Sequence, residues 1–326
     1  MTTAEKIVEI GKRLATFGDD VQSQTIVQRA IEQNSWFTEQ SIVNAVRAIA
    51  ADMLQPEQLD KWLSHYPIPV SQPRRVLVIM AGNISAVGFA DLLSVAASGH
   101  TALVKYSSKD TPTMQYIATL FAEYFDVREY DGCEPIDALL AMGSDATAVA
   151  LREKYAGVPM LIRASRNSLA VLSGDESCFE LQGLCHDITA YDGRGCRSVS
   201  LVFVPCGYDF DGLLSALAGC EVSRKWMQVY KHTKALYRMS GASFVDAANA
   251  ILVRSDEFPM NIATIHYVEY ASPVDIDKWL KLHDDKVQCV VGRIPHPRAV
   301  EFGMAQHPTL WDYPDGIDTM QFLNSI

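Results

Sequence analysis

Residues 75–106 read RVLVIMAGNISAVGFADLLSVAASGHTALVKY. The apolar run at residues 76–80 predicts a buried strand, and the pattern at residues 89–97 predicts a helix that ends at Gly99. A second apolar run at residues 101–106 predicts another strand. A strand that leads through a helix into a further strand is typical of a parallel sheet, so this stretch indicates an α/β fold.

The alternation of strands and helices continues along the chain. Residues 112–125 indicate a second helix, and residues 139–142 indicate a third strand. Parallel sheets of this kind bind ligands beyond the carboxyl ends of their strands. Asn83 follows the first strand, and Gly143 and Ser144 follow the third. We therefore expect a ligand site that includes these residues.

The regions on either side differ in pattern. Residues 1–66 read as helical, with Thr38 as the N-cap of a helix whose apolar face runs to Met53. A second block of strands and helices begins after Ser168. Its expected strands are residues 169–172, 199–204, 262–270 and 287–291, and its expected helices are residues 213–239 and 276–282. With 326 residues, the chain is long enough for about two domains.

The composition supports a packed globular protein and argues against a general nucleic-acid binder. Hydrophobic residues make up 48% and charged residues 21% of the chain. The 28 Lys and Arg residues against 39 Asp and Glu residues give a net charge of −11, whereas nucleic-acid binders normally present a basic face. A local basic pocket for a phosphorylated ligand is still compatible with this charge.

The seven cysteines predict neither a disulfide framework nor a zinc site. They are Cys133, Cys178, Cys185, Cys196, Cys206, Cys220 and Cys289. Their number is odd and no pair has CxxC spacing, so we expect free thiols and no metal. The first residues lack the apolar stretch of a signal peptide, and no apolar run reaches membrane-spanning length. We expect a cytoplasmic protein without a membrane span.

One cysteine differs from the others in its sequence context. Cys196 lies in YDGRGCRS, residues 191–198, directly before the apolar run at residues 199–205. A cysteine between a glycine-containing turn and a buried strand can combine an open approach with a rigid base. Arg194 and Arg197 flank it, and nearby cations favour the thiolate, which is the nucleophilic form. Cys196 is therefore a candidate nucleophile; the alternative is a small core residue, as most free cysteines are.

Four short motifs occur in one order, namely GNI at residues 82–84, LVKYSS at residues 103–108, GSDAT at residues 143–147, and the Cys196 segment. This order resembles the aldehyde dehydrogenase superfamily. More narrowly, the chain resembles the LuxC family of fatty acyl reductases, acyl-CoA reductases that supply aldehyde in bacterial bioluminescence. The sequence WDYPDG at residues 311–316 supports the narrower match, and the resemblance covers the chain from about residue 75 onwards.

The resemblance implies an aldehyde-dehydrogenase-like α/β fold. Such a fold has a Rossmann-type nucleotide domain with a parallel sheet and an α/β catalytic domain, here with additional N-terminal helices. We expect residues 1–168 to form the N-terminal helices and the nucleotide-binding domain. Residues 169–326 then form the catalytic domain that carries the nucleophile, with the C-terminal segment able to pack back on the first domain.

The same resemblance assigns roles residue by residue. Cys196 matches the family nucleophile, and Asn83 matches the asparagine whose amide holds the substrate oxyanion; the alternative for Asn83 is a turn residue after a strand. Lys105 matches the lysine that contacts the adenosine ribose, or is an exposed lysine at a strand end. Gly143 and Ser144 match the loop and helix start near the cofactor pyrophosphate, or form an ordinary helix cap.

Ser107 and Ser108 complete the expected cofactor site. Many superfamily dehydrogenases bind the ribose hydroxyls with a glutamate where Ser108 stands in this chain. Without that carboxylate a 2′-phosphate meets less repulsion, and Lys109 could pair with it. We therefore expect NADPH as the cofactor, with NADH possible because Asp110 follows directly.

A second departure concerns the glutamate base of the hydrolytic family members. Arg163 occupies its expected position at the start of RASRNS, residues 163–168. That base activates water to hydrolyse the thioester intermediate, a step that a reductase does not need. Basic residues here suit an anionic thioester donor such as acyl-CoA. The alternatives are a slip in the alignment or a protein that has lost its activity.

Further candidates lie outside these motifs. His186, ten residues before Cys196, could orient or deprotonate the thiol, or could be a structural histidine. Trp311, Asp315 and Gly316 could shape the acyl or nicotinamide site, or could serve packing at the chain end.

The combined features predict an NAD(P)H-dependent oxidoreductase. It is expected to reduce an acyl thioester, acyl-CoA or acyl-carrier protein, to a fatty aldehyde through an acyl-cysteine intermediate. The expected partners are that thioester and either further copies of the chain or a reductase complex, with no nucleic acid and no membrane. Two alternatives stay open: a non-catalytic aldehyde-dehydrogenase-like scaffold subunit of a fatty-acid reductase complex, and an acyl-phosphate reductase.

Overall fold

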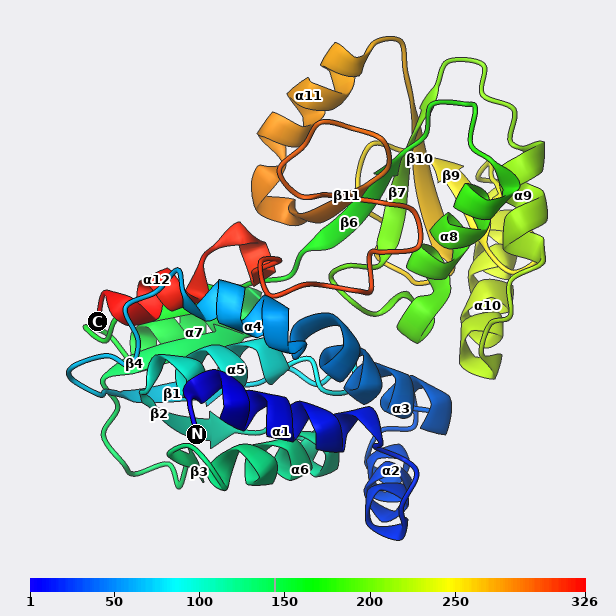
Figure 1. Ribbon diagram of the computed structural model, residues 1–326. Coiled ribbons are helices and arrows are strands. Elements are labelled where there is room, and N and C mark those ends of the chain that lie inside the picture. Colours follow the sequence, from blue (N-terminus) through cyan, green and yellow to red (C-terminus); the bar gives the residue numbers. More distant parts are fainter. Residues whose placement is uncertain (144) are drawn as a thin grey trace. The chain divides into compact units, whose positions relative to one another are not determined.

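Figure 1 shows the computed structural model of the protein, which describes residues 1–143 and 145–326. The chain forms two compact units. The first unit comprises residues 1–165 and 308–326, and the second comprises residues 166–307. Each unit holds a sheet with helices on both faces, so the expected α/β class is confirmed. The division of function between two domains stays a prediction.

The N-terminal residues are helical, as their pattern indicates. The helices are α1 (Thr3–Ala15), α2 (Val21–Gln33), α3 (Glu39–Ala48) and α4 (Pro56–Leu63), with a π-helical turn (Ile49–Met53) after α3. Thr38 caps α3, because its hydroxyl accepts the backbone N–H of Ser41 at 3.1 Å, which confirms the predicted N-cap. The buried faces of these helices join the core of the first unit through side chains such as Ile10, Leu14 and Trp62.

The first unit is built around a five-stranded parallel sheet. Its strands are β1 (Arg75–Ile79), β2 (Thr101–Lys105), β3 (Val127–Glu129), β4 (Ala138–Met142) and β5 (Met160–Arg163), in the order β3-β2-β1-β4-β5. β1 and β2 pair with Arg75 opposite Thr101, and α5 (Phe89–Ser98) connects them, as residues 75–106 predict. The strand order reverses between β1 and β4, and at such a point α/β sheets form a ligand crevice beyond the strand ends.

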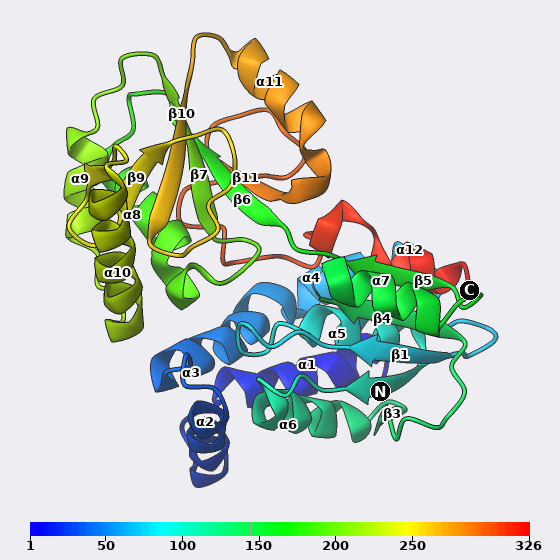
Figure 2. The ribbon, with the colours of Figure 1, turned by 180° about the vertical axis from the view of Figure 1, so that it is seen from behind.

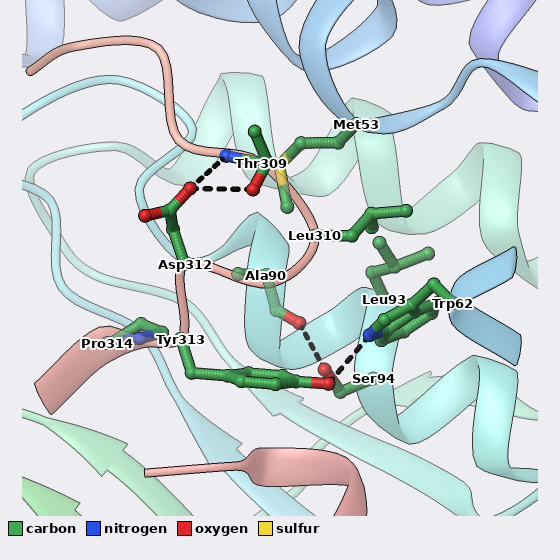
Figure 3. Close-up of a pocket in the computed structure, with 10 residues that line it drawn as sticks. All are labelled: Met53, Trp62, Ala90, Leu93, Ser94, Thr309, Leu310, Asp312, Tyr313 and Pro314. Atoms are coloured by element: carbon green, nitrogen blue, oxygen red, sulfur yellow. Dashed lines mark hydrogen bonds between the residues drawn. The ribbon is translucent and has the colours of Figure 1, made fainter. Parts of the chain in front are cut away.

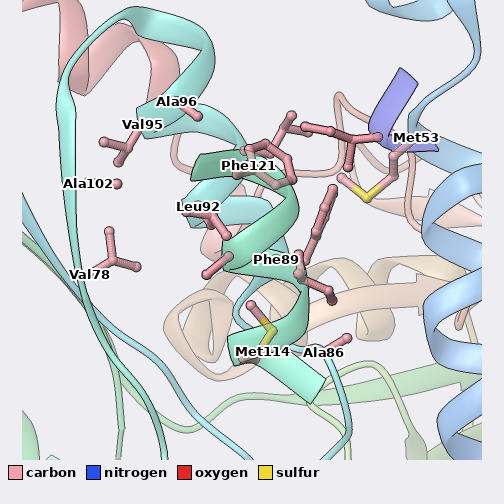
Figure 4. Packing of buried hydrophobic residues seen from close by; sticks show 14 of the residues in the cluster. Met53, Val78, Ala86, Phe89, Leu92, Val95, Ala96, Ala102, Met114 and Phe121 are labelled. Carbon is pink, nitrogen blue, oxygen red and sulfur yellow. The ribbon is translucent and has the colours of Figure 1, made fainter. Parts of the chain in front are cut away.

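Helices cover both faces of this sheet (Figure 2). α5, α6 (Thr111–Ala122) and α12 (Thr319–Asn324) pack with the N-terminal helices on one face, and α7 (Asp145–Lys154) packs on the other. Figure 4 shows the core on the first face, where the rings of Phe89 and Phe121 lie edge to face with centroids 5.9 Å apart. Leu92 and Val78 belong to the same cluster. This close packing gives the loops that follow β1 and β2 a rigid base.

The second unit contains a seven-stranded mixed sheet. Its strands are β6 (Asn167–Val171), β7 (Val199–Pro205), β8 (Val245–Asp246), β9 (Ile251–Arg254), β10 (Thr264–Tyr270), β11 (Val287–Val291) and β12 (Ala299–Val300), in the order β12-β11-β6-β7-β10-β9-β8. β8 runs antiparallel to β9, whereas the other neighbouring strands are parallel.

Helices again lie on both faces of the second sheet. They are α8 (Cys178–Thr189), α9 (Asp211–Ala218), α10 (Arg224–Ser240) and α11 (Pro273–Leu282). The first three pack on one face and α11 packs on the other (Figure 1). Short 3-10 helices occur at Ala190–Gly193, Asp284–Lys286 and, in the first unit, Pro314–Gly316.

The structure divides one expected helix and adds elements that sequence reasoning did not place. The helix expected at residues 213–239 is two helices, because α9 ends at Gly219 and Ser223 caps α10 by accepting the Trp226 N–H at 3.0 Å. The unplaced elements include the helices α8 and α12 and the short strands β3, β5, β8, β9 and β12. α8 begins with Ser177 in a capping box, a local signal that could have revealed it.

Candidate functional site

Three of the expected site residues lie at the carboxyl edge of the first sheet. Asn83 follows β1, Lys105 ends β2 and Gly143 follows β4. Ile79 at the end of β1 lies opposite Lys105, and the parallel pairing of β1 with β4 puts the end of β4 at the same edge. Lys105 is exposed and Asn83 is half-buried. Ser144, expected at the same site, lies outside the described residues.

The turn that carries Asn83 lies tightly against the loop after β2. A Cβ atom on Gly82 would stand 2.5 Å from Ser107 Oγ and 2.8 Å from Ser107 Cβ, so this approach requires glycine. The Lys109 N–H donates to the Ser107 hydroxyl at 3.2 Å, and Ser108 and Lys109 are exposed. The structure thus brings the expected oxyanion residue and two expected cofactor residues onto adjoining loops.

Gly143 leads from β4 into α7. Its N–H donates to the Arg163 carbonyl at 3.1 Å, which continues the pairing of β4 and β5 at this end. A Cβ on Gly143 would lie 2.9 Å from Thr147 Cβ in the first turn of α7. Glycine therefore lets the helix begin close to the strand end. In α/β folds, a helix that begins at such a place is a common anion-binding position.

Cys196 lies in the second unit, in the turn directly before β7. The Ser198 N–H donates to the Gly195 carbonyl at 3.0 Å, and the Gly195 N–H donates to Ser198 Oγ at 3.3 Å. Ser168 Oγ donates to the carbonyl of Cys196 itself at 2.9 Å. Cys196 is a half-buried residue. The backbone around Cys196 is thus fixed by hydrogen bonds, and the catalytic role of this residue stays a prediction.

Ser168 connects this turn to a neighbouring strand, and sequence reasoning missed it. The side chain is fully buried in β6. Its oxygen accepts the Cys289 N–H at 3.1 Å while its proton is donated to the Cys196 carbonyl. A buried hydroxyl that both donates and accepts fixes the backbone segments that it bridges. No local pattern reveals this role, because Ser168 and Cys289 are 121 positions apart.

The Arg197 side chain is bound to the backbone of a loop in the same unit. Its Nε donates to the Ala305 carbonyl at 2.5 Å. The buried Asp187 of α8 holds that loop by accepting the N–H groups of Gly303 and Ala305 at 2.7 and 2.9 Å. Burial raises the pKa of Asp187 to about 6, although these donors and nearby cationic side chains oppose the shift. A guanidinium group next to Cys196 in the chain is thereby held in one place.

Arg194 and His186 are the other residues expected to act on the thiol. Desolvation lowers the pKa of Arg194, while the nearby Asp192 opposes this shift. Desolvation and then the charge of His307 lower the pKa of His186, which lies in α8. A lowered pKa favours the neutral imidazole, which is the form that can accept a proton. The role of His186 as a base stays a prediction.

The structure corrects the expectation for Arg163. Its side chain is 2% exposed, and Nη1 donates to both carboxylate oxygens of Asp91, at 2.6 and 2.7 Å. Nη2 donates to Thr319 Oγ1 at 2.7 Å, so the guanidinium joins β5, α5 and α12. Arg166 likewise donates to the Asp284 carbonyl at 3.0 Å. The expectation that Arg163 suits an anionic donor is wrong, because a buried charge must be neutralised by a partner inside the protein.

The C-terminal segment packs on the first unit through a chain of hydrogen bonds. Trp62 Nε1 donates to the Tyr313 hydroxyl at 2.6 Å, as Figure 3 shows. The Tyr66 and Tyr313 hydroxyl oxygens lie 2.7 Å apart. The Tyr66 hydroxyl donates to Asp318 Oδ2 at 2.7 Å. α4 and the residues after it therefore hold the segment in place.

The small pocket in Figure 3 lies where this segment meets α5, with Leu93 and Leu310 among its lining residues. Its volume is about 10 Å³, room for about one water molecule and none for a substrate. The Trp311 ring lies 5.6 Å from the His65 ring. These contacts support packing as the role of Trp311, and the expected roles of Asp315 and Gly316 near a ligand stay predictions.

Residues 1–143 and 145–326, which the structure describes, contain neither a cluster of metal ligands nor a membrane-spanning helix. Within these residues, no three His, Cys, Asp or Glu side chains are grouped so that they could hold a metal ion. Within the same residues, no helix has the length and apolar character needed to span a membrane.

No family model matches the sequence, and no curated protein matches it. Solved structures do match. An acetylating aldehyde dehydrogenase from Geobacillus thermoglucosidasius is 11% identical, with 95% of this chain and 86% of that chain covered and a TM-score of 0.61. Aldehyde dehydrogenase 21 from Physcomitrella patens, in complex with the reaction product succinate, is 11% identical, with 90% and 72% covered and a TM-score of 0.63.

A third structure, the NAD+ complex of an aldehyde dehydrogenase from Bacillus cereus, is 16% identical, with 91% of this chain and 73% of that chain covered and a TM-score of 0.59. At such low identity the likeness concerns the fold. The narrower resemblance to the LuxC family stays a prediction. The protein has the fold of the aldehyde dehydrogenases.

Proposed function

We propose that this protein uses a nicotinamide cofactor to reduce an acyl thioester, carried on coenzyme A or an acyl-carrier protein, to an aldehyde. The observation that carries the proposal is Cys196, a half-buried thiol in a hydrogen-bonded turn before β7, within an aldehyde dehydrogenase fold. One structural neighbour bears the name acetylating aldehyde dehydrogenase, which supports acyl transfer as chemistry that this fold can host. More narrowly, we propose that the protein is similar in activity to the LuxC-type fatty acyl reductases.

In the first step the Cys196 thiolate attacks the carbonyl carbon of the thioester. A bond forms between Cys196 Sγ and that carbon, the carbon–sulfur bond of the donor breaks, and the departing thiolate takes up a proton from solvent. The acyl group is then held as a thioester on Cys196. Arg194 and Arg197 favour the attacking thiolate over the thiol, because their guanidinium groups are cationic.

Asn83 donates a hydrogen bond to the oxyanion that forms during this attack. The backbone N–H of Cys196 is the second donor. A donor that is already in position when the charge develops contributes about 3 kcal/mol to lowering the barrier. Gly82 and its close approach to the neighbouring loop support this role, because they hold the turn that carries Asn83.

The residues at the carboxyl edge of the first sheet fit a nicotinamide dinucleotide, which supplies a hydride for the acyl-cysteine when it is bound. Lys105 binds the ribose, and Ser107 and Ser108 complete the loop around it. Gly143 and Ser144 bind the pyrophosphate at the start of α7. The strand order that reverses between β1 and β4 supports this assignment, because dinucleotides bind at such a reversal.

The preference for NADPH is supported by the surroundings of Asp110. Its carboxyl is fully buried and accepts the Ala86 N–H at 2.7 Å, and burial raises its pKa to about 7. It therefore does not present a full negative charge to a 2′-phosphate. The exposed Ser108 and Lys109 are available to that phosphate instead. NADH is the alternative.

Reduction rather than hydrolysis is supported by the residue at the expected place of the general base. Hydrolysis of the acyl-cysteine needs a group that accepts a proton from water. Arg163 stands at that place, and its guanidinium, which donates to Asp91, offers only donor N–H groups and no acceptor atom. It cannot activate water, so the acyl group on Cys196 is kept for reduction.

Intact mass of the protein after mixing with acyl-CoA, without reductant, tests this proposal. We expect one added acyl group that maps to Cys196 and is absent from the Cys196→Ser protein. Addition of NADPH should then release the aldehyde and restore the unmodified mass. Cys178→Ser is the matched control, because Cys178 is an exposed thiol in the same unit, and it should acylate as the wild type does.

The outcomes separate the candidate functions. An unmodified wild-type protein, or equal acylation of the wild-type and Cys196→Ser proteins, would contradict the proposal. Faster acylation of Cys196 by an acyl phosphate would favour an acyl-phosphate reductase. A ligand that binds the native state raises the melting temperature, so the absence of any thermal shift with NADPH or NADH would favour the non-catalytic scaffold.

A further inference from the structure

A buried carboxylate joins the two loops that follow β1 and β2. We call residues 82–88 the asparagine turn and residues 106–110 the cofactor loop. Asp110, at the end of the cofactor loop, is fully buried, and its Oδ2 accepts the backbone N–H of Ala86 at 2.7 Å. Its Oδ1 accepts the Ser85 hydroxyl at 3.4 Å. Both donors belong to the asparagine turn, so one side chain ties the turn to the loop.

The asparagine turn needs this support because of its backbone. Ala86 has a φ of 60°, in the left-handed region that residues with a Cβ atom rarely adopt. Such a conformation persists only where the surrounding structure holds it. The hydrogen bond from Ala86 to Asp110 is a contact of that kind. Close packing adds to it, because a Cβ on Gly82 would lie 3.2 Å from Asp110 Cβ.

A second side chain connects the same two loops from the N-terminal helices. Asn34 follows α2 and is buried. Its Nδ2 donates to the Lys109 carbonyl at 3.2 Å and to the Gly82 carbonyl at 3.4 Å. The amide therefore bridges the cofactor loop and the residue directly before Asn83.

We propose that Asp110 and Asn34 are positioning residues that hold the Asn83 amide in one orientation relative to the cofactor loop. The proposal rests on the proposed function, because it takes Asn83 as the oxyanion donor. Such a donor is effective when it is held within about 0.5 Å of its productive position. Loosening the turn therefore slows acyl transfer although Asn83 is still present. Asp110 contributes more than Asn34, because it accepts two donors of the asparagine turn.

A double-mutant cycle on the acylation of Cys196 tests the proposal. The rate of acyl transfer from acyl-CoA is measured in a single turnover for Asn83→Ala, for Asp110→Ala and for the double variant. We expect Asn83→Ala to slow acylation about 100-fold and Asp110→Ala about 10-fold. The double variant should be slower than Asn83→Ala by no more than about twofold, because Asp110 acts through Asn83. Asp110→Asn keeps an oxygen acceptor for the Ala86 N–H and should recover most of the wild-type rate.

Asp137→Ala is the matched control. Asp137 also accepts a backbone N–H, that of Arg75 at 2.8 Å, but at the amino end of β1. We expect this variant to lose stability and to acylate at the wild-type rate. Amide hydrogen exchange adds a readout that does not depend on activity. Asp110→Ala should exchange faster across residues 83–88, whereas Asp137→Ala should not.

The results that would overturn the proposal are distinct from failure of the proposed function. If Asp110→Ala slows the acylation of Cys196 by the same factor in the wild-type and Asn83→Ala backgrounds, Asp110 has only a general structural role. If Asp110→Ala leaves amide hydrogen exchange across the asparagine turn unchanged, Asp110 does not hold that turn. If the wild-type protein is not acylated at all, the proposed function fails, and the exchange experiment alone decides whether Asp110 holds the turn. Should Asp110→Ala not fold, Asn34→Ala enters the same cycle and the same exchange experiment, with a smaller effect in the same direction.

Discussion

Cys196 differs from the other cysteines of the chain by its surroundings. The buried cysteines are Cys185 and Cys289, the exposed ones are Cys133, Cys178 and Cys206, and Cys196 and Cys220 are half-buried. A hydrogen bond with Cys185 lowers the pKa of Cys220, which favours the thiolate, so we expect thiol reagents to modify Cys220 as well. Reactivity alone therefore does not identify the nucleophile, and the acyl group has to be mapped to a residue. The turn before β7, bonded to Ser168, is what distinguishes Cys196.

At the same scale, the buried carboxyl of Asp110 should make the stability of the protein depend on pH. Burial raises its pKa from an ordinary 3.8 to about 7 in the folded protein, although hydrogen bonds to the carboxylate oppose the shift. Because folding favours the protonated carboxyl, its contribution to stability is complete below pH 3.8 and is lost as the pH rises through 7. Asp110→Asn cannot ionise at this position. We therefore expect its unfolding free energy, relative to that of the wild type, to rise by about 2 kcal/mol as the pH increases from about 5 to about 8.

Urea unfolding of both proteins at several pH values measures this gain. A difference between the two that stays constant across the range would show that Asp110 does not titrate in the folded state as proposed. The Asp137→Ala protein is the control here as well, because hydrogen bonds with Arg75 lower the pKa of Asp137 instead of raising it. Its stability relative to the wild type should stay nearly constant over the same pH range.

At the scale of elements, the turn that carries Cys196 is held by strands and a helix that lie elsewhere in the sequence. Ser168 of β6 bonds to its carbonyl, and the same hydroxyl accepts an N–H from β11. Asp187 of α8 fixes the loop to which the Arg197 side chain is bonded. The position of the thiol therefore depends on three elements that pack together. The turn sequence itself supplies the glycine and the hydrogen bonds within the turn.

Ser168→Ala tests this dependence. It leaves the Cys196 carbonyl and the Cys289 N–H without their buried partner, so we expect a loss of about 1–3 kcal/mol of unfolding free energy. We also expect slower acylation of Cys196, because its backbone is less constrained. Ser94→Ala is the matched control, since the buried Ser94 hydroxyl donates to the Ala90 carbonyl within α5. Urea unfolding and the single-turnover rate measure both effects, and equal results for the two variants would contradict the role of Ser168.

At the scale of the whole molecule, both ends of the chain contribute to the first unit. The N-terminal helices and residues 308–326 join the same hydrophobic cluster on one face of its sheet. The Trp62–Tyr313 hydrogen bond and the contact of Arg163 with Thr319 add polar links to the returning segment. The second unit is thus an insertion in the sequence of the first. The core that supports the proposed cofactor site is complete only when the end of the chain has returned.

Leu323→Ala tests the contribution of that segment. Leu323 lies fully buried in α12, and a large-to-small change in a core costs about 2–5 kcal/mol. Ile317→Ala is the control, because Ile317 belongs to the same segment and is 43% exposed. We expect Leu323→Ala to increase amide hydrogen exchange in β1 and β2 and to leave exchange in β6 and β7 unchanged. Faster exchange in the second unit instead would contradict this assignment of the C-terminal segment.

Several elements could be predicted because their signals lie within a few residues. The strand–helix–strand pattern of residues 75–106 follows from apolar runs and a glycine stop, and the Thr38 N-cap follows from capping chemistry. The short strands β3 and β9 carry too few residues for a period to show. The helix expected at residues 213–239 was too long, because apolar spacing continues across the break at Gly219.

The sequence by itself determined the α/β class and the residues that follow β1, β2 and β4 of the first sheet, since apolar spacing and turn chemistry are local. Parallel strands end at one edge, so the neighbourhood of Asn83 and Gly143 followed from the same reasoning, whereas Lys105 was expected at the site from the family resemblance. Only the tertiary structure decided the partners that hold these residues. Arg163 meets Asp91 72 positions away. The Asn34 amide meets the backbone of a loop 75 positions away. Such contacts depend on how the helices pack on the sheet, and no short stretch of sequence contains that information.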